Sequence, residues 1–374
     1  MSELYIGLMS GTSLDGIDAG LVDFRDNKCE IIAFHYSPFD ETLKQQLRLL
    51  SQPDTPVFLT DLGAMDARLG RLFAEAVHNL LANSQIPADS IEAIGSHGLT
   101  IYHAPQAEFP FSLQIGDPNI IAQSTGITTV ADFRRRDIAA HGQGAPLVPA
   151  FHHHFFGKRQ KNICVVNIGG IANITVLSNE TAIGFDTGPG NTLLDYWIGR
   201  NRGKSHDEGG EWARQGKPVD DLLEQLKKDP YFQLAPPKST GKEYFSGLWL
   251  EKHLGNYSDV PSQDIQATLC RLTADTITEA IKKYAPATEE TLICGGGCHN
   301  HYLLEMIGSN LDHPVSSTDD YGIDPDHVEA IAFAWLARQT LHNHPGNLPK
   351  ATGAEAPVIL GGIYPGERGL RRER

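Results

Sequence analysis

The chain has 374 residues, of which 40% are hydrophobic and 21% charged, and its formal net charge is -15. This composition is that of an ordinary globular protein, and the length exceeds what one hydrophobic core usually supports, so we expect two domains. The negative charge argues against nucleic acid or an anionic membrane as the main partner, because either would repel it, but a local basic pocket could still hold an anionic substrate.

The first part of the chain alternates between strand and helix patterns. Apolar runs predict strands at 4–10, 16–24, 29–39 and 91–103, and apolar residues at helical spacing predict a helix that starts after residue 55 and ends near residue 84. Residues 112–133 have the pattern of a strand, a short helix and a second strand. Such alternation is typical of α/β layers.

The segment 134–149, RRRDIAAHGQGAPLVP, is polar and contains glycines, as connections between domains often do. After it, we expect two strands joined by a Gly-Gly turn within 161–178, then a strand, a loop and the start of a helix within 181–199. Residues 201–262 are polar, with helices and loops. The remaining predicted elements are a helix over 265–285, a strand with a glycine turn and a helix over 291–307, and a helix within 324–341 that Asp326 would cap.

Two stretches share one pattern of strand, glycine-containing turn and strand. They are residues 5–24, YIGLMSGTSLDGIDAGLVDF, and residues 164–178, CVVNIGGIANITVLS. Strands joined by a short glycine turn indicate a β-hairpin, and α/β material follows each of them. The repeated pattern suggests a duplicated α/β domain with a cleft between the copies.

The glycine turn at 11–18 is not a P-loop. A P-loop needs a lysine after its last glycine and a helix behind it, whereas a second strand is predicted here. The stretch GRNRGKS at 199–205 has the lysine, but it has too few residues between its glycines and follows a helix.

The turn at 11–18 can still bind phosphate by another route. Backbone N–H groups and the hydroxyls of Thr12 and Ser13 could hold the anion, and Asp15 and Asp18 suit an accompanying Mg2+. The alternative is a hairpin turn made of ordinary turn-forming residues, and these residues alone leave both interpretations open.

The turn CGGGCHN at 294–300 follows a predicted strand and precedes a helix. Its glycines would let a flat ligand such as adenine or ribose lie against the backbone. A zinc site would have to use Cys294, Cys298, His299 and His301, and four ligands crowded at one turn suit tetrahedral zinc poorly.

Several polar residues are candidates for a site, each beside an ordinary structural alternative. Asp186 ends a predicted strand before a glycine turn, where it could act as a general base or merely cap a helix. The adjacent arginines 134–136 cannot all point one way, so some would bind an anion and the others pair with neighbouring acids. His97 lies beside glycine at a strand end, and Glu329, on a helix, would by default face solvent.

The first residues, MSELYIGLMSG, lack the basic and apolar regions of a signal peptide. No apolar run approaches the roughly 20 residues that cross a bilayer. The five cysteines are few and odd in number, which is typical of a reducing compartment. We therefore expect a cytoplasmic protein.

Several of these stretches, in order along most of the chain, resemble the anhydro-N-acetylmuramic acid kinases of bacterial cell-wall recycling. The stretches are GLMSGTSLDGID, GSHGLTIYH, LQIGDPNIIA, VADFRRRDIAAHGQGAPLVP, NIGGIANIT, GFDTGPGNTLLD, CGGGCHN and DPDHVEAIAFAWLA. That family belongs to the superfamily of sugar kinases, heat-shock ATPases and actin. The resemblance implies an α/β fold of two duplicated actin-like ATPase (ribonuclease H-like) domains with an interdomain cleft. We expect residues 1–133 plus 350–374 to form the first domain and residues 134–349 the second.

The resemblance also implies the reaction, with ATP and Mg2+ required. The sugar, 1,6-anhydro-N-acetylmuramate, would be opened by water and phosphorylated on O6, giving N-acetylmuramate 6-phosphate. Asp186 would be the base that activates the water, and His97, Arg135 and Glu329 would bind the sugar. Arg134 and Arg136 stay open as alternatives to Arg135.

The nucleotide site that the resemblance implies is built from three stretches. Asp15 and Asp18 would meet the metal, and which of the two does so stays open. A homodimer is implied as well. His141, in AAHGQGAPL, is a departure, since the family is expected to favour glycine there. The residues expected to bind ATP are Gly11, Thr12, Ser13, Leu14, Asp15, Gly16, Ile17, Asp18, Asn167, Gly169, Gly170, Gly295, Gly296 and Gly297.

A second hypothesis, of another class, is a regulatory or chaperone-like ATPase of the same superfamily that binds a protein in place of a sugar. It would hydrolyse ATP slowly and form no phosphorylated sugar. The chain shows no added substrate-binding β domain and no long lid segment, which argues against it. An acetate or ordinary hexose kinase is disfavoured because Asp186 lies in a DTGPGN loop that matches the anhydro-sugar family.

Overall fold

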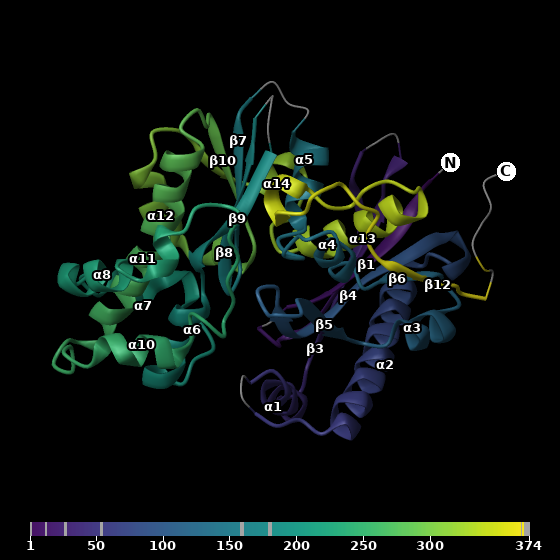
Figure 1. Cartoon of the computed structure of the whole chain (residues 1–374), viewed down its shortest axis with the longest axis horizontal. Coiled ribbons are helices and arrows are strands. Elements are labelled where there is room, and N and C mark those ends of the chain that lie inside the picture. Colours follow the sequence, from purple (N-terminus) through teal and green to yellow (C-terminus); the bar gives the residue numbers. More distant parts are fainter. Residues whose placement is uncertain are drawn as a thin grey trace. The chain divides into compact units, whose positions relative to one another are not determined.

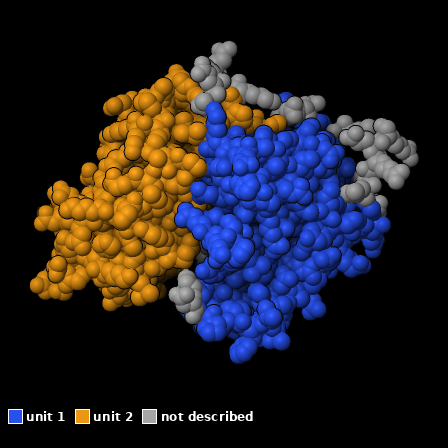
Figure 2. Space-filling model, in the orientation of Figure 1, with its two compact units in different colours: residues 1–151, 327–374 blue, residues 152–326 orange. Residues whose placement is uncertain are grey.

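The computed structural model describes residues 2–11, 13–25, 28–52, 55–157, 161–178, 182–367 and 369, and Figure 1 labels its elements. The chain divides into two compact units, which Figure 2 colours separately. Unit 1 comprises residues 1–151 and 327–374, and unit 2 comprises residues 152–326. Each unit has its own sheet with helices packed on it, so the predicted α/β class is confirmed.

The sheet of unit 1 begins with the antiparallel strands β1 (Leu4–Ser10), β2 (Gly16–Asp23) and β3 (Glu30–Pro38). β4 (Ile91–Ala104) pairs parallel with β1, and β6 (Thr129–Ala131) pairs parallel with β4. β5 (Phe111–Ile115) pairs antiparallel with β4, and β12 (Gly362–Tyr364) pairs antiparallel with β6. The helices of this unit are α1 (Glu41–Leu50), α2 (Leu59–Ser84), η2 (Ala88–Ser90), α3 (Pro118–Thr125), α4 (Arg135–Ala139), the start of α5 (Val148–Phe156), α13 (Val328–Leu341) and α14 (Pro349–Thr352).

Helices α2 and α13 cover opposite faces of this sheet. Alternate residues of a strand point to opposite faces, and Ile6 and Leu8 of β1 lie in the hydrophobic core that α2 also enters. On the other face, a Cβ placed on Gly7 would lie 1.7 Å from the carbonyl oxygen of Ala330 in α13. Glycine at position 7 therefore allows the backbone of α13 to lie directly on the sheet.

The sheet of unit 2 repeats the strand order of unit 1. β7 (Ile163–Ile168), β8 (Ile171–Leu177) and β9 (Ala182–Pro189) are antiparallel, and β10 (Glu290–Cys294) and β11 (Val315–Ser317) continue in parallel from β7. The helices of this unit, besides the end of α5, are α6 (Thr192–Arg202), η3 (Glu208–Gly210), α7 (Glu211–Arg214), α8 (Asp220–Lys227), α9 (Pro230–Gln233), α10 (Gly247–Leu254), α11 (Ser262–Tyr284), η4 (Gly296–His299), α12 (His301–Asn310) and η5 (Thr318–Tyr321).

The matching strand orders confirm the predicted duplication. Unit 1 contains the order β3-β2-β1-β4-β6 and unit 2 the order β9-β8-β7-β10-β11, with the same strand directions at each pairing. Both predicted hairpins form, β1 with β2 and β7 with β8. The predicted cleft between the domains stays a prediction.

The predicted domain boundaries, at 133/134 and 349/350, also stay a prediction, and the compact units divide elsewhere, at 151/152 and 326/327. Residues from 327 onwards join unit 1 because α13 packs on β1, β2 and β4 of the first sheet.

The predicted cap of α13 is wrong. The helix begins at Val328 with His327 at the N-cap position, and the Asp326 carboxylate pairs with His299 instead. No helix in the described part of the chain combines the length and the apolar character that crossing a membrane requires.

Candidate functional site

The loop between β1 and β2 is a tight turn in unit 1. The Leu14 N–H donates to the carbonyl oxygen of Gly11 at 3.1 Å, and the Ser10 hydroxyl donates to the carbonyl oxygen of Gly16 at 2.8 Å. Leu14 and Ile17 are buried, so neither side chain can reach a ligand. Ser13 is exposed, and Thr12 lies outside the described residues. Binding of an anion by the backbone N–H groups of residues 11–18 stays a prediction.

The carboxylates of Asp15 and Asp18 lie close enough to Tyr36 of β3 that both charges affect its pKa. Asp15 is exposed, and Asp18 is half-buried and in register with Tyr36 of β3. Burial raises the pKa of Tyr36, and the charges of Asp15 and Asp18 raise it further. Two carboxylates in one region fit Mg2+, which usually takes one or two carboxylates and completes its shell with water and substrate phosphates.

In unit 2, the turn of the second hairpin lies against the glycine turn that follows β10. A Cβ on Gly295 would lie 2.2 Å from the side-chain oxygen of Asn167, and a Cβ on Gly297 would lie 2.3 Å from the Ile168 side chain. Gly295 also has a φ of 80°, in the left-handed region that favours glycine. By contrast, a Cβ on Gly296 would meet no atom of the described residues within 4 Å. The structure thus brings these predicted nucleotide-site residues together.

The hairpin turn is tied to the DTGPGN loop that follows β9. The N–H groups of Gly190 and Thr192 donate to the carbonyl oxygen of Gly170 at 2.9 and 3.1 Å. The Asn191 N–H donates to the carbonyl oxygen of Gly169 at 2.8 Å. The loop that carries the proposed base therefore also fixes the predicted phosphate turn.

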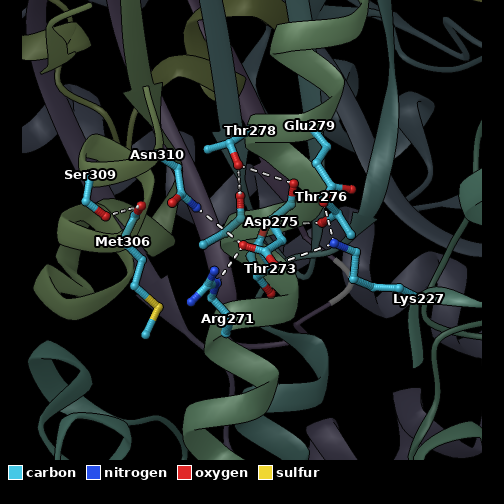
Figure 3. Close-up of polar contacts among 11 residues, drawn as sticks. Lys227, Arg271, Thr273, Asp275, Thr276, Thr278, Glu279, Met306, Ser309 and Asn310 are labelled. Carbon is cyan, nitrogen blue, oxygen red and sulfur yellow. Dashed lines mark hydrogen bonds and ion pairs between the residues drawn. The ribbon is translucent and has the colours of Figure 1, made fainter. Parts of the chain in front are cut away.

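Helix α11 also contacts the DTGPGN loop. The Thr273 hydroxyl donates to two successive carbonyl oxygens of that loop at 3.1 and 3.0 Å. Two residues further on, the Asp275 carboxylate accepts from Arg271 at 2.7 Å and from Asn310 at 3.3 Å, and pairs with Lys227 at 3.5 Å (Figure 3). These contacts anchor α11 to α8 and α12.

Asp186, near the end of β9, is only 8% exposed. Its carboxylate accepts a hydrogen bond from the Thr240 N–H at 2.9 Å, and its own N–H donates to the carbonyl oxygen of Lys238 at 3.1 Å. The Tyr231 hydroxyl donates to the carbonyl oxygen of Asp186 at 2.8 Å. The Thr240 N–H thus holds one carboxylate oxygen of Asp186, and the other two bonds fix its backbone.

Lys238 is a buried cation beside Asp186. Its Nζ donates to the carbonyl oxygen of Tyr231 at 3.3 Å and lies 4.5 Å from the centroid of the Tyr231 ring. Burial lowers the pKa of Lys238 to about 8, the charge of Lys283 lowers it as well, and the charge of Asp186 opposes them.

His97, in β4 of unit 1, holds Arg134. The Nε2 atom of His97 accepts from the Arg134 guanidinium at 3.1 and 2.8 Å, and its Nδ1 atom lies 3.0 Å from the carbonyl oxygen of Gly98. Burial lowers the pKa of His97 well below its usual value, and the charge of Arg134 lowers it further, so the ring is neutral and donates through Nδ1. Arg134 also donates to the carbonyl oxygen of Gly144 at 2.8 Å, and its guanidinium is thereby engaged within the fold.

Arg135 is in a different situation. Its side chain is 56% exposed, and its Nε atom lies 3.5 Å from an Asp132 carboxylate oxygen. With Asp132, Arg136 and the Gly361–Gly362 backbone, Arg135 lines a hollow of about 300 Å³. Glu329 is half-buried in the first turn of α13, in the same unit.

A model of the anhydro-N-acetylmuramic acid kinase family matches residues 3–366. The chain belongs to this family. The anhydro-N-acetylmuramic acid kinase of Coxiella burnetii (strain Dugway 5J108-111) is 50% identical over 371 residues, which are 98% of each chain. That of Pasteurella multocida (strain Pm70) is 47% identical over 367 residues, or 97% of each chain. Among solved structures, component A of the Acidaminococcus fermentans (R)-2-hydroxyglutaryl-CoA dehydratase has a TM-score of 0.47 at 12% identity, covering 89% of this chain and 96% of its own.

As a member of the anhydro-N-acetylmuramic acid kinase family, the protein is a kinase that uses ATP, and the hypothesis of a regulatory or chaperone-like ATPase is not favoured.

His141, where the family is expected to favour glycine, has a backbone conformation that suits glycine. His141 has a φ of 64°, in the region that glycine adopts most easily, and the turn still forms, with the His141 N–H donating to the carbonyl oxygen of Ile138 at 2.9 Å.

Sequence reasoning missed the residues that surround Asp186 in this kinase. Tyr231, Lys238 and Thr240 all lie within 201–262, which has no strong periodic pattern. The one local signal is the stretch KSTGK at 238–242, whose small polar residues and glycine are typical of a loop that approaches a ligand or another backbone.

Proposed function

We propose that this kinase opens 1,6-anhydro-N-acetylmuramate with water and phosphorylates the released O6 with ATP, giving N-acetylmuramate 6-phosphate for peptidoglycan recycling and amino sugar catabolism. The observation that carries the proposal is the Asp186 carboxylate, buried in the DTGPGN loop and oriented by the Thr240 N–H at 2.9 Å. Membership of the family supports the choice of sugar.

Asp186 is the proposed general base. It takes a proton from a water molecule as the water oxygen bonds to the anomeric carbon of the sugar, C1. The bond between C1 and O6 breaks, and O6 attacks the γ-phosphorus of ATP, whose bond to the bridging oxygen breaks as ADP leaves. A general base of this kind accelerates a reaction by roughly 10²–10⁴.

The sugar is proposed to bind through residues of unit 1. The exposed guanidinium of Arg135 suits the lactyl carboxylate, because a guanidinium can bind a carboxylate through two parallel hydrogen bonds. Glu329 would accept hydrogen bonds from sugar groups. His97, which contacts Arg134, belongs to this proposed sugar site as the residue that fixes the neighbouring arginine.

The nucleotide is proposed to bind through the glycine turns. Backbone N–H groups of residues 11–18 and 167–170 would hold the phosphates, and Gly295–Gly297 would line the adenosine. Asp15 and Asp18 would hold Mg2+, which when bound neutralises charge on the phosphates. We further propose that the protein acts in the cytoplasm, as a homodimer, and without nucleic acid.

The test of the base is Asp186→Asn, which keeps the shape of the side chain and removes its basicity. We expect consumption of the anhydro sugar to fall by roughly 10²–10⁴, while ATP binding by calorimetry is retained. Asp221→Asn, at an exposed position of α8, is the control and should keep full activity. Turnover near that of the wild type in Asp186→Asn would show that another residue is the base.

The reaction itself is tested by mass spectrometry of the product formed from anhydro sugar, ATP and H2(18)O. We expect the label at the anomeric hydroxyl and the phosphate on O6. A label in the phosphate, or a product that keeps the anhydro ring, would overturn the proposed reaction.

A further inference from the structure

Cys298, His299 and Asp326 come together at the surface of unit 2, beside the glycine turn that follows β10. The Cys298 sulfur, a His299 ring nitrogen and an Asp326 carboxylate oxygen all lie within 4.8 Å of one another. The His299 Nε2 atom lies 2.7 Å from an Asp326 carboxylate oxygen. The proposed kinase reaction uses none of these three side chains.

A main-chain hydrogen bond joins the two segments, and further bonds order the backbone within each segment. The Cys298 N–H donates to the carbonyl oxygen of Gly295 at 2.9 Å, and the Gly295 N–H donates to the carbonyl oxygen of Pro325 at 2.9 Å. The Asp326 N–H donates to an Asp324 carboxylate oxygen at 2.9 Å. The backbone therefore brings the three side chains together without a bound ion.

The donor set favours a borderline transition metal. Thiolate sulfur, imidazole nitrogen and carboxylate oxygen are the ligands of zinc sites, and three protein ligands with an open fourth position is a common arrangement. Sulfur argues against Mg2+ and Ca2+, which take oxygen ligands. Bonds of roughly 2.0–2.3 Å separate the ligand atoms of a tetrahedral site by roughly 3.3–3.8 Å. The side chains of His299 and Asp326, 66% and 44% exposed, have room for the small rotations that this requires.

We propose that Cys298, His299 and Asp326 form a binding site for Zn2+, with water as the fourth ligand. The site differs from the one considered from the sequence, because Cys294 is fully buried in β10 and His301 is outside the cluster. It replaces two ligands of the same turn by a carboxylate from a distant segment, which removes the crowding that argued against zinc.

The test is a titration of the metal-free, full-length protein with Co2+, followed by absorption spectroscopy. We expect a thiolate-to-cobalt charge-transfer band and the visible bands of tetrahedral Co2+, saturating at one equivalent and lost on addition of Zn2+. The readout does not depend on kinase activity, so it can succeed or fail independently of the proposed function.

Single substitutions identify the ligands. Cys298→Ser should remove the charge-transfer band, and His299→Ala and Asp326→Asn should each weaken Co2+ binding roughly tenfold or more. Cys29→Ser and His301→Ala are the matched controls and should keep the wild-type spectrum. Circular dichroism checks that each variant is folded. A wild-type protein without saturable binding, or a band that persists in Cys298→Ser, would overturn the proposal.

Discussion

At the scale of single residues, burial distinguishes the three adjacent arginines that the sequence presents as equals. Arg134 is engaged with His97 and with the carbonyl oxygen of Gly144. Arg135 and Arg136 are exposed and line the same hollow. Arg135 donates through Nε to the carbonyl oxygen of Ser112 at 3.4 Å, but its side chain is 56% exposed. The exposed pair is therefore better placed than Arg134 to meet an anionic substrate.

The choice between Arg135 and Arg136 can be tested by replacing each with methionine. We expect Arg135→Met to raise KM for the anhydro sugar roughly 10–100-fold, because a hydrogen bond to a charged group contributes about 1.5–3 kcal/mol. Its kcat should change much less. Arg136→Met is the matched control, and its KM for the anhydro sugar should stay within about twofold of the wild-type value. Steady-state kinetics at varied sugar concentration measure both variants. The reverse pattern would move the assignment to Arg136.

At the scale of elements, neighbouring glycines of the turn after β10 differ in the space around them. Gly295 is required by the fold, since a side chain there would collide with Asn167. Gly296 has no such constraint from the described residues. A methyl group at Gly296 would therefore meet no described atom within 4 Å, and it would disturb adenosine if the nucleotide lies on this turn as proposed.

Replacing Gly295 and Gly296 in turn distinguishes an effect on stability from an effect on ATP binding. We expect Gly296→Ala to keep the wild-type stability in urea and to weaken ATP binding tenfold or more, because its methyl group would occupy the space proposed for adenosine. Gly295→Ala should lower both stability and ATP binding. Denaturation and calorimetry with a non-hydrolysable ATP analogue measure the two effects. Unchanged ATP binding by Gly296→Ala would mean that adenosine does not lie on this turn.

Asp137 in α4 connects distant elements of unit 1. Its buried carboxylate accepts from the Gly144 N–H at 2.8 Å, and from the side chains of Asn347 and Thr352 at 2.7 Å each. We expect Asp137→Ala to lower the free energy of unfolding by at least about 3 kcal/mol, because each buried donor left without a partner costs about 1–3 kcal/mol. Glu355→Ala, exposed in the same C-terminal segment, should have little effect on urea unfolding. Equal stability of the two variants would contradict this role.

At the scale of the whole molecule, buried histidines make stability depend on pH. Burial lowers the pKa of His152 to about 3, and burial together with the charge of Arg134 lowers the pKa of His103 to about 4. Such a histidine stays neutral in the folded state but takes up a proton when unfolded below about pH 6.5. The unfolded state then binds more protons, so stability falls as the pH falls below that value.

His152 offers the clearest test, since it is fully buried with its Nδ1 atom 2.9 Å from the Thr175 hydroxyl. Each such histidine lowers the free energy of unfolding by about 1.4 kcal/mol per pH unit below about pH 6.5. Between about pH 7.5 and pH 5, His152→Asn should therefore lose less stability than the wild type, by about 2 kcal/mol. Urea midpoints at both pH values measure this, with His78→Asn, exposed on α2, as the control. Equal losses in wild type and His152→Asn would contradict the argument.

Most of the secondary structure followed from local patterns in the chain. The two hairpins, the long helices α2 and α11 and the duplicated α/β plan follow from hydrophobic periodicity and turn residues, which act between near neighbours. The Asp326 cap failed because Asp326 turns to His299, 27 residues earlier in the chain, a partner that no local pattern reveals.

Local sequence patterns were thus sufficient for the elements, the duplication and the family, because each of these depends on residue types at short, regular spacing. Packing decided the rest. Three features each join residues that are far apart in the sequence: the partners of Asp186, the bond between Arg134 and His97, and the grouping of Cys298 and His299 with Asp326. Such contacts arise only when the sheets and helices are assembled, since burial and hydrogen bonding across elements determine which side chains meet.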